Sequence, residues 1–206
     1  MQETKSIIVP NEEFVKKNYV KTITLLQQFE LSDLAKLIEN FAEEYATTPA
    51  STDEKYHCAF PGGLAYHNLY VLQWIGRFAG AMGADKFSKK SLLKVSILHS
   101  VGKLGDVDIP YYLPVSEDWK IKKGIYFEFN PLLSYMKIPQ RSLYLAQKFG
   151  VELSEEEYLA VLLADGQLDE TNRPYKYKDP NLAVVLQNAV YWARREAKNL
   201  KVNWTP

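Results

Sequence analysis

The sequence is short of several features that would assign it to a class at once. It has one cysteine, Cys58, so an intramolecular disulfide is excluded and a reducing compartment is favoured. Its first residues lack the basic-then-apolar pattern of a secretory signal. Its apolar runs are interrupted well short of the ~20 residues that span a bilayer. We therefore expect a cytoplasmic protein that does not associate with membranes.

An excess of charge of either sign is also absent. The chain has 25 Lys+Arg and 25 Asp+Glu, for a formal net charge of +0, which argues against a protein built to coat nucleic acid. Hydrophobic residues make up 47% of its 206 residues, enough for a substantial core. We expect residues 1–206 to form a single domain, with residues 1–10 as an extended N-terminal arm.

Apolar residues recur at helical spacing over most of the chain. The pattern predicts an all-α bundle of about seven helices. They are a helix capped by Asn11, then helices near 32–46, 64–82, 88–102, 131–150 with a break near Pro139, 154–163 and 179–198. Ser88 and the Asp179-Pro180 pair are expected N-terminal caps, and Ser154 with Glu157 forms a capping box. Residues 50–62 and 165–178 are expected to be loops.

A different pattern interrupts the helices near residues 107–130. Two groups of β-favouring residues flank a polar turn at 116–118. We predict a short β-hairpin or ordered loop as an insertion in the bundle.

The three histidines lie in two glycine-containing stretches. His57 and His67 flank a Pro-Gly-Gly turn at residues 61–63, which permits positive φ and close backbone approach. His99 is followed by the Gly-Lys-Leu-Gly segment that contains Lys103. A lysine between two glycines is well suited to bind phosphate, because little bulk blocks the ligand. These stretches are candidates for a phosphate or metal site.

A third candidate stretch is Asp165-Gly166-Gln167, at the end of a predicted helix. Each stretch taken alone also has a purely structural interpretation. A single histidine on an apolar helix is more often a hydrogen-bonded core residue, and Asp-Gly is a common turn pair. Cys58 is interpreted as a small buried residue rather than a nucleophile, and the Arg194-Arg195 pair as a solvated helix face.

Taken together, the stretches resemble the HD-domain superfamily of metal-dependent phosphohydrolases. The matching segments are residues 57–64 with His67, 98–105, 141–145 and 165–167, within a similarity that covers about residues 40 to 195. The similarity is closest to phage and bacterial members with a Pro-Gly-Gly-Leu turn before the first metal-binding histidine. The resemblance implies a helical bundle with a metal site at its centre, in the host cytoplasm if the protein is phage-encoded.

The sequence departs from the family at the metal ligands. Ser100 stands where the family has the aspartate of its His-Asp pair, and Val190 where it has its last aspartate. A hydroxyl is a poor substitute for a carboxylate on a divalent cation, and an isopropyl group cannot bind one. Ala164 and residues 138–140 stand near the places where relatives with a second metal have histidines.

The ligands that remain are a remnant set. His67 and His99 survive from the mononuclear site, and His57 and Asp165 are candidates to complete it. The resemblance also assigns four residues to the lining of the pocket. These ligand-binding candidates are Lys103, Asp106, Arg141 and Gln167, with Tyr144 or Tyr175 available to stack on a base.

Three hypotheses follow. The first is a pseudoenzyme without a cofactor that binds a nucleotide, another phosphorylated ligand or a protein partner. The second is a divergent active phosphohydrolase, whose divalent metal (Mg, Mn, Fe, Zn, Ni or Co) is held by the remnant set. The third is a structural subunit or homo-oligomer, whose interface is formed by the aromatic residues of the 107–130 insertion and Trp204.

Overall fold

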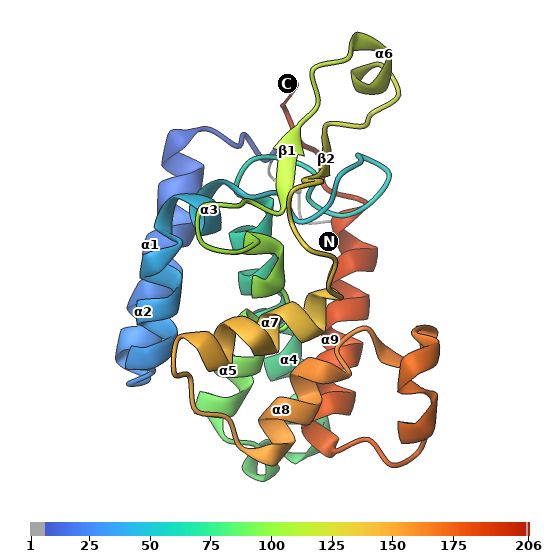
Figure 1. Ribbon diagram of the computed structural model, residues 1–206. Coiled ribbons are helices and arrows are strands. Elements are labelled where there is room, and N and C mark those ends of the chain that lie inside the picture. Colours follow the sequence, from blue (N-terminus) through green and yellow to red (C-terminus); the bar gives the residue numbers. More distant parts are fainter. Residues whose placement is uncertain (1–6, 205) are drawn as a thin grey trace.

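The computed structural model describes residues 7–204 and 206, and this part of the chain is mostly helical (Figure 1). Its seven longer helices are α1 (Glu12–Gln28), α2 (Ser32–Asn40), α4 (Gly63–Gly83), α5 (Lys89–Leu98), α7 (Ile138–Lys148), α8 (Glu155–Leu162) and α9 (Asn181–Ala197). The short helices are α3 (Ala42–Thr47), α6 (Asp118–Ile121) and the 3-10 helices η1 (Ala84–Lys86), η2 (Val101–Leu104), η3 (Gly166–Leu168) and η4 (Glu170–Tyr175). The predicted all-α architecture is confirmed.

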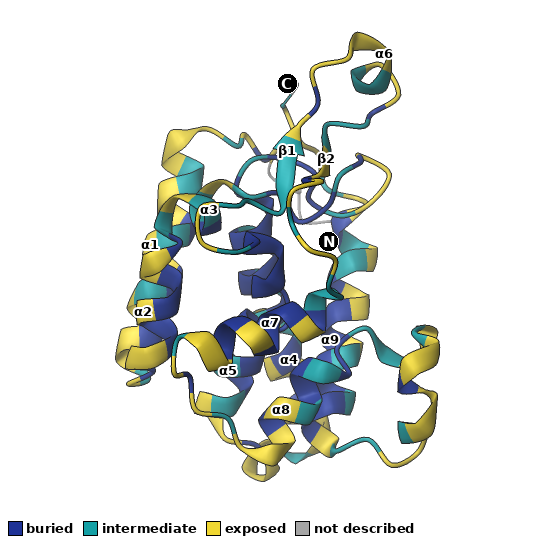
Figure 2. Cartoon of the chain, in the orientation of Figure 1, coloured by how far each residue is buried: buried dark blue, intermediate teal, exposed yellow. Residues whose placement is uncertain are grey.

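Helix α4 is the element around which the others pack. It contacts α1, α3, α5 and α9, and its first half is buried almost all round. Figure 2 shows the same distribution, with exposed residues on the outer faces of the surrounding helices. A helix surrounded in this way needs apolar or small residues on every side, which its sequence provides. None of the described helices is both long and apolar enough to cross a bilayer.

Three predicted helix starts are confirmed by their capping hydrogen bonds. The side chains of Asn11 and Ser88 each accept a hydrogen bond from a backbone N–H in the first turn of α1 and α5. Ser154 and Glu157 form the reciprocal capping box of α8, at 3.2 and 3.0 Å. Caps are local interactions between residues three apart, so the sequence alone specifies them.

Other predicted boundaries are wrong. The second predicted helix is divided at Phe41, which is buried in the core with φ −116° and separates α2 from α3. The helix expected from Pro131 begins only at Ile138, and Pro139 lies in its first turn, where no backbone N–H is required. The helix expected to reach Gly102 ends at Leu98, and the chain then tightens into η2.

The predicted Asp179 cap of the last helix is also wrong. Helix α9 begins at Asn181 after Pro180, which supplies no side-chain cap. The Asp179 carboxylate instead accepts hydrogen bonds from the side-chain amides of Gln167 at 3.1 Å and Gln187 at 3.3 Å. The region expected to be a loop before it contains η3 and η4.

The Pro-Gly-Gly turn connects the 50–62 loop to α4. Gly62 has φ +75°, and its N–H donates to the carbonyl of Thr47 at 2.8 Å. A Cβ on Gly63 would lie 2.1 Å from the carbonyl oxygen of Cys58, so only glycine fits there. The turn thereby places the loop that carries His57 directly against the start of α4.

The predicted hairpin is confirmed. Strands β1 (Tyr112–Pro114) and β2 (Phe127–Phe129) pair antiparallel, and α6 lies in the connection, which projects from one end of the molecule (Figure 1). The Trp204 ring stacks on Phe127 with centroids 5.9 Å apart, so part of the aromatic surface covers the protein's own chain. Of the predicted arm, residues 1–6 lie outside the described residues, and Ile8 pairs with Val202 in an isolated parallel bridge.

Candidate functional site

The fold brings the three histidines together from three different elements. His57 lies in the loop before α4, His67 near the start of α4, and His99 directly after α5. The ring centroids of His57 and His67 are 4.5 Å apart, and those of His67 and His99 are 5.7 Å apart. His67 and His99 are buried and His57 is half-buried. We call these three residues the histidine cluster.

The histidine cluster contains polar atoms that the described residues leave unpaired. Nδ1 of His99 lies 2.9 Å from the carbonyl oxygen of Ser96, to which it donates when it carries the proton. The other nitrogen of His99, both nitrogens of His67 and Nε2 of His57 are buried without a hydrogen-bond partner in this part of the chain. A buried unpaired polar atom costs about 1–3 kcal/mol, so the four nitrogens are unfavourable for folding unless another group pairs with them.

Lys103 adds a buried amine beside the histidine cluster. It is 7% exposed, and its Nζ donates to the carbonyl oxygen of Ala50 at 2.5 Å. Burial, with a smaller contribution from the nearby Arg194, lowers the pKa of Lys103 to about 7. Burial also raises the pKa of the Cys58 thiol to about 12, which leaves that side chain protonated and unreactive.

Burial, together with the nearby basic groups, keeps the three imidazoles neutral. Burial, with smaller contributions from the charges of Arg194 and Lys103, lowers the pKa of His99 to about 3. The pKa values of His57 and His67 are also well below the usual range, first because of burial and then because of neighbouring basic groups. The cluster therefore presents neutral ring nitrogens in a positively charged environment.

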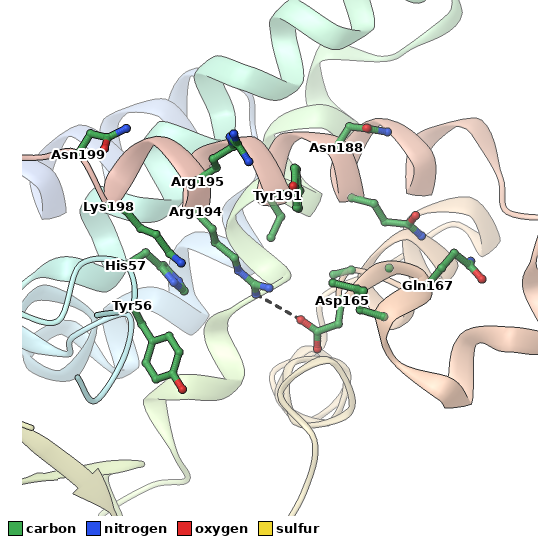
Figure 3. Close-up of a pocket in the computed structure, with 15 residues that line it drawn as sticks. Tyr56, His57, Asp165, Gln167, Asn188, Tyr191, Arg194, Arg195, Lys198 and Asn199 are labelled. Atoms are coloured by element: carbon green, nitrogen blue, oxygen red, sulfur yellow. Dashed lines mark hydrogen bonds and ion pairs between the residues drawn. The ribbon is translucent and has the colours of Figure 1, made fainter. Parts of the chain in front are cut away.

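A cleft of about 680 Å³ opens beside His57, between the 50–62 loop, α9 and the segment that follows α8 (Figure 3). Three cations line it: Arg194 and Arg195 in the last turn of α9, and Lys198 directly after that helix. Asp165 is the one carboxylate among the described lining residues, and its Oδ1 lies 3.2 Å from Nη2 of Arg194. Both side chains of this pair are 37% exposed, so the ion pair is weak and can be exchanged for another anion.

The four residues predicted to bind a ligand do not lie together in the structure. Gln167 lines the cleft, and Lys103 lies beside the histidine cluster. Asp106 instead pairs with Lys148 at 2.6 Å on the surface, away from the cleft. Its interaction with that lysine lowers the pKa of the Asp106 carboxyl group.

Arg141, the remaining predicted ligand-binding residue, is 3% exposed and donates to the backbone carbonyl of Ser134. It is not among the residues that line the cleft. Tyr144 and Tyr175, the predicted stacking residues, are absent from the lining as well, whereas Tyr56 and Tyr191 are present.

Sequence reasoning missed the cations of α9. Arg194 and Arg195 were expected to form a solvated helix face, yet both line the cleft. The available signal was helical spacing. Val190 and Arg194 are four residues apart and share one face of α9, and Lys198 continues that spacing directly after the helix. Val190 stands where the resemblance puts an inward-facing ligand.

The residues present do not fit a divalent cation. Ser100 donates its hydroxyl hydrogen bond to Oδ1 of Asn68 at 2.5 Å, and Val190 is buried and apolar. Asp165 is already paired with Arg194. No group of three or more His, Cys, Asp or Glu side chains in the described part of the chain is arranged to hold a metal. Neutral imidazoles beside Lys103 and Arg194 would leave a cation's charge uncompensated.

Fold and site together define a helical protein with a cationic cleft next to a buried histidine cluster. Comparison of the chain with family models, curated proteins and solved structures finds no match. The relationship to the HD-domain superfamily therefore stays a prediction from the quoted motifs.

Proposed function

We propose that the protein binds a phosphorylated small molecule or nucleotide in the cationic cleft, as a pseudoenzyme of the HD-domain type that does not hydrolyse its ligand through a metal centre. The observation that carries the proposal is the charge of the cleft. Three cations line it against one carboxylate, which is already paired, and the charges that act most on His57 are those of basic residues.

The chemistry of the lining suits a phosphate group. The guanidinium of Arg194 can form two parallel hydrogen bonds to phosphate oxygens, and Lys198 adds a second positive charge. The side-chain amides of Gln187 and Asn188 also line the cleft and offer donors and acceptors for the rest of the ligand. The volume of about 680 Å³ lies within the ~300–1,000 Å³ of small-molecule sites.

Calorimetric titration with inorganic phosphate and with adenosine 5′-monophosphate tests the proposal. We expect saturable binding that Arg194→Gln weakens at least tenfold, because the substitution removes a charge-assisted contact. Arg173→Gln is the matched control, since Arg173 is exposed on η4 and does not line the cleft. Absence of binding by either probe, or equal weakening by both substitutions, would contradict the proposal.

A divergent active phosphohydrolase is the second candidate. One observation favours it, which is the convergence of His57, His67 and His99 from distant parts of the sequence. It requires Asp165 to leave Arg194 and join the histidines. Stoichiometric metal in the purified protein, with release of phosphate from deoxynucleotides that His67→Ala and His99→Ala abolish, would establish this candidate and refute the first.

A further inference from the structure

A second cavity, separate from the cationic cleft, lies along the second half of α4. It has a volume of about 310 Å³ and is bordered by α1, α4, η1 and α5. Its walls are apolar side chains, among them Leu25, Phe29, Leu72, Ile75, Phe87 and Leu92. We call it the α4 apolar pocket.

Two exposed glycines line the α4 apolar pocket. Gly76 and Gly80 are one turn apart in the interior of α4, and both line the pocket. A Cβ at either position would meet no atom within 4 Å, so neighbouring groups do not exclude a larger side chain. Glycine is less favourable than alanine inside a helix. Packing against the protein's own side chains therefore does not require glycine at these two exposed positions, and their lack of side chains leaves this side of the pocket open.

One exposed lysine lines the edge of the pocket. Lys89 is the one charged residue among the described residues that line it, and this lysine makes no ion pair within the described part of the chain. Lys86 and Lys90 are close to it in sequence, together with one acid, Asp85. An apolar interior with an unpaired amine at the entrance is complementary to an amphiphile with an anionic head.

We propose that the α4 apolar pocket binds a free long-chain fatty carboxylate. Its alkyl chain would lie over Gly76 and Gly80, and its carboxylate would pair with Lys89. The volume is at the lower end of the ~300–1,000 Å³ of small-ligand sites, which fits a single chain. This proposal does not depend on the proposed function of the cationic cleft.

Calorimetry with decanoate, laurate and myristate below their micelle concentrations is the first test. Each buried methylene is expected to raise affinity about fourfold, so two add roughly 15-fold until the pocket is full. Dodecyltrimethylammonium, with a cationic head, should bind more weakly than laurate. Affinity that is independent of chain length, or stronger for the cationic amphiphile, would overturn the proposal.

Substitutions then place the ligand. Gly80→Leu should fill the pocket and reduce myristate affinity at least tenfold. Gln73→Leu, on an exposed position of α4 that does not line the pocket, should leave it unchanged. Lys89→Gln should weaken binding about threefold, as expected for an exposed ion pair, and Lys90→Gln should have a smaller effect. Thermal unfolding establishes that each variant is folded.

The same variants exclude other occupants. Equal loss of myristate binding in Gly80→Leu and Gln73→Leu would place the ligand elsewhere and refute the assignment. Sedimentation of the free protein as a dimer that Gly80→Leu disrupts would assign the surface to a second copy instead. Binding to anionic vesicles without binding of monomeric myristate would likewise refute it.

Discussion

The histidine cluster and the α4 apolar pocket lie at opposite ends of α4, and the two ends of this helix are built on opposite principles. Near its start, His67 is 0% exposed and both of its ring nitrogens are unpaired within the described residues. Toward its end, Ile75 and Ala79 form an apolar floor at 0% and 2% exposure. Apolar burial stabilises the fold directly, whereas unpaired polar burial costs free energy. The first half of α4 therefore carries a feature that apolar burial does not explain.

Introducing carboxylates at Ser100 and Val190 should have the largest effect on stability. Ser100→Asp combined with Val190→Asp places two charges at positions that are 2% and 1% exposed. Without metal, we expect a loss of unfolding free energy on the order of 3 kcal/mol. If the two residues stand at the former ligand positions, Mn²⁺ should recover most of this loss, because binding to the folded state stabilises it. Urea unfolding with and without Mn²⁺ measures both.

Val185→Asp is the matched control for that pair. It introduces a carboxylate on the same helix at 0% exposure, at a position that does not line the cleft. We expect destabilisation without any recovery by Mn²⁺. Recovery in the control, or none in the double variant, would show that Val190 does not occupy a ligand position.

The sequence predicted those parts of the fold that depend on neighbouring residues. The caps at Asn11 and Ser88 are decided within one helical turn, and the Pro-Gly-Gly turn needs glycine for reasons that are local. The break at Phe41 was missed because its cause is tertiary, namely the burial of this side chain in the core.

The candidate site was only partly predictable, because local sequence patterns identify its histidines but packing decides which other residues face them. The histidines were singled out from their glycine-containing stretches, but which charges would face them was decided by packing. A Cβ on Gly102 would lie 2.4 Å from the carbonyl oxygen of Ile138, so η2 sits directly against the start of α7. In this packing Arg141 donates to Ser134, outside the cleft. Arg194 lies four residues after the buried Val190, so helical spacing placed it on the same face of α9, but which elements face that side was decided by packing.

His67→Leu tests whether the polar end of α4 sacrifices stability. The substitution removes two buried nitrogens without a partner among the described residues, and it keeps an apolar side chain in the core. We expect the unfolding free energy to rise by about 1–2 kcal/mol. Ile75→Val, at the apolar end of the same helix, should lower it by about 0.5–1.5 kcal/mol. Urea denaturation of both variants measures the two changes in unfolding free energy. A loss of stability in His67→Leu would show that the buried nitrogens of His67 do not destabilise the fold.

The pH dependence of stability should report the burial of His99 in the histidine cluster. His99 has a folded-state pKa of about 3, lowered by burial from 6.5, so between these values the unfolded chain binds a proton that the folded protein does not. Stability from this residue is therefore fully present above pH 6.5 and is lost as the pH falls towards 3. The slope is up to about 1.4 kcal/mol per pH unit, or roughly 3–5 °C in Tm.

His99→Leu isolates this contribution from that of the carboxyl groups. Between pH 7 and 5, the Tm of the variant should fall less steeply than that of the wild-type protein. Lys103 also makes stability rise with pH, but in a higher pH range. Its folded-state pKa of about 7 lies below the ordinary 10.5, so between these values the unfolded chain binds a proton that the folded protein does not. Parallel Tm curves for the two proteins below pH 7 would refute the neutral, buried state of His99.

Asp165→Asn should cause the smallest change in free energy, and it tests ligand binding in the cationic cleft most directly. The carboxylate occupies Arg194 at 3.2 Å and so competes with an incoming anion. Because both groups are 37% exposed, their pair contributes no more than about 1 kcal/mol, and removing it should raise phosphate affinity about threefold. Asp169→Asn is the matched control, since Asp169 pairs with Lys137 and does not line the cleft. If Asp165→Asn weakens phosphate binding instead, Asp165 is a ligand-side partner rather than a competitor, as the divergent hydrolase requires.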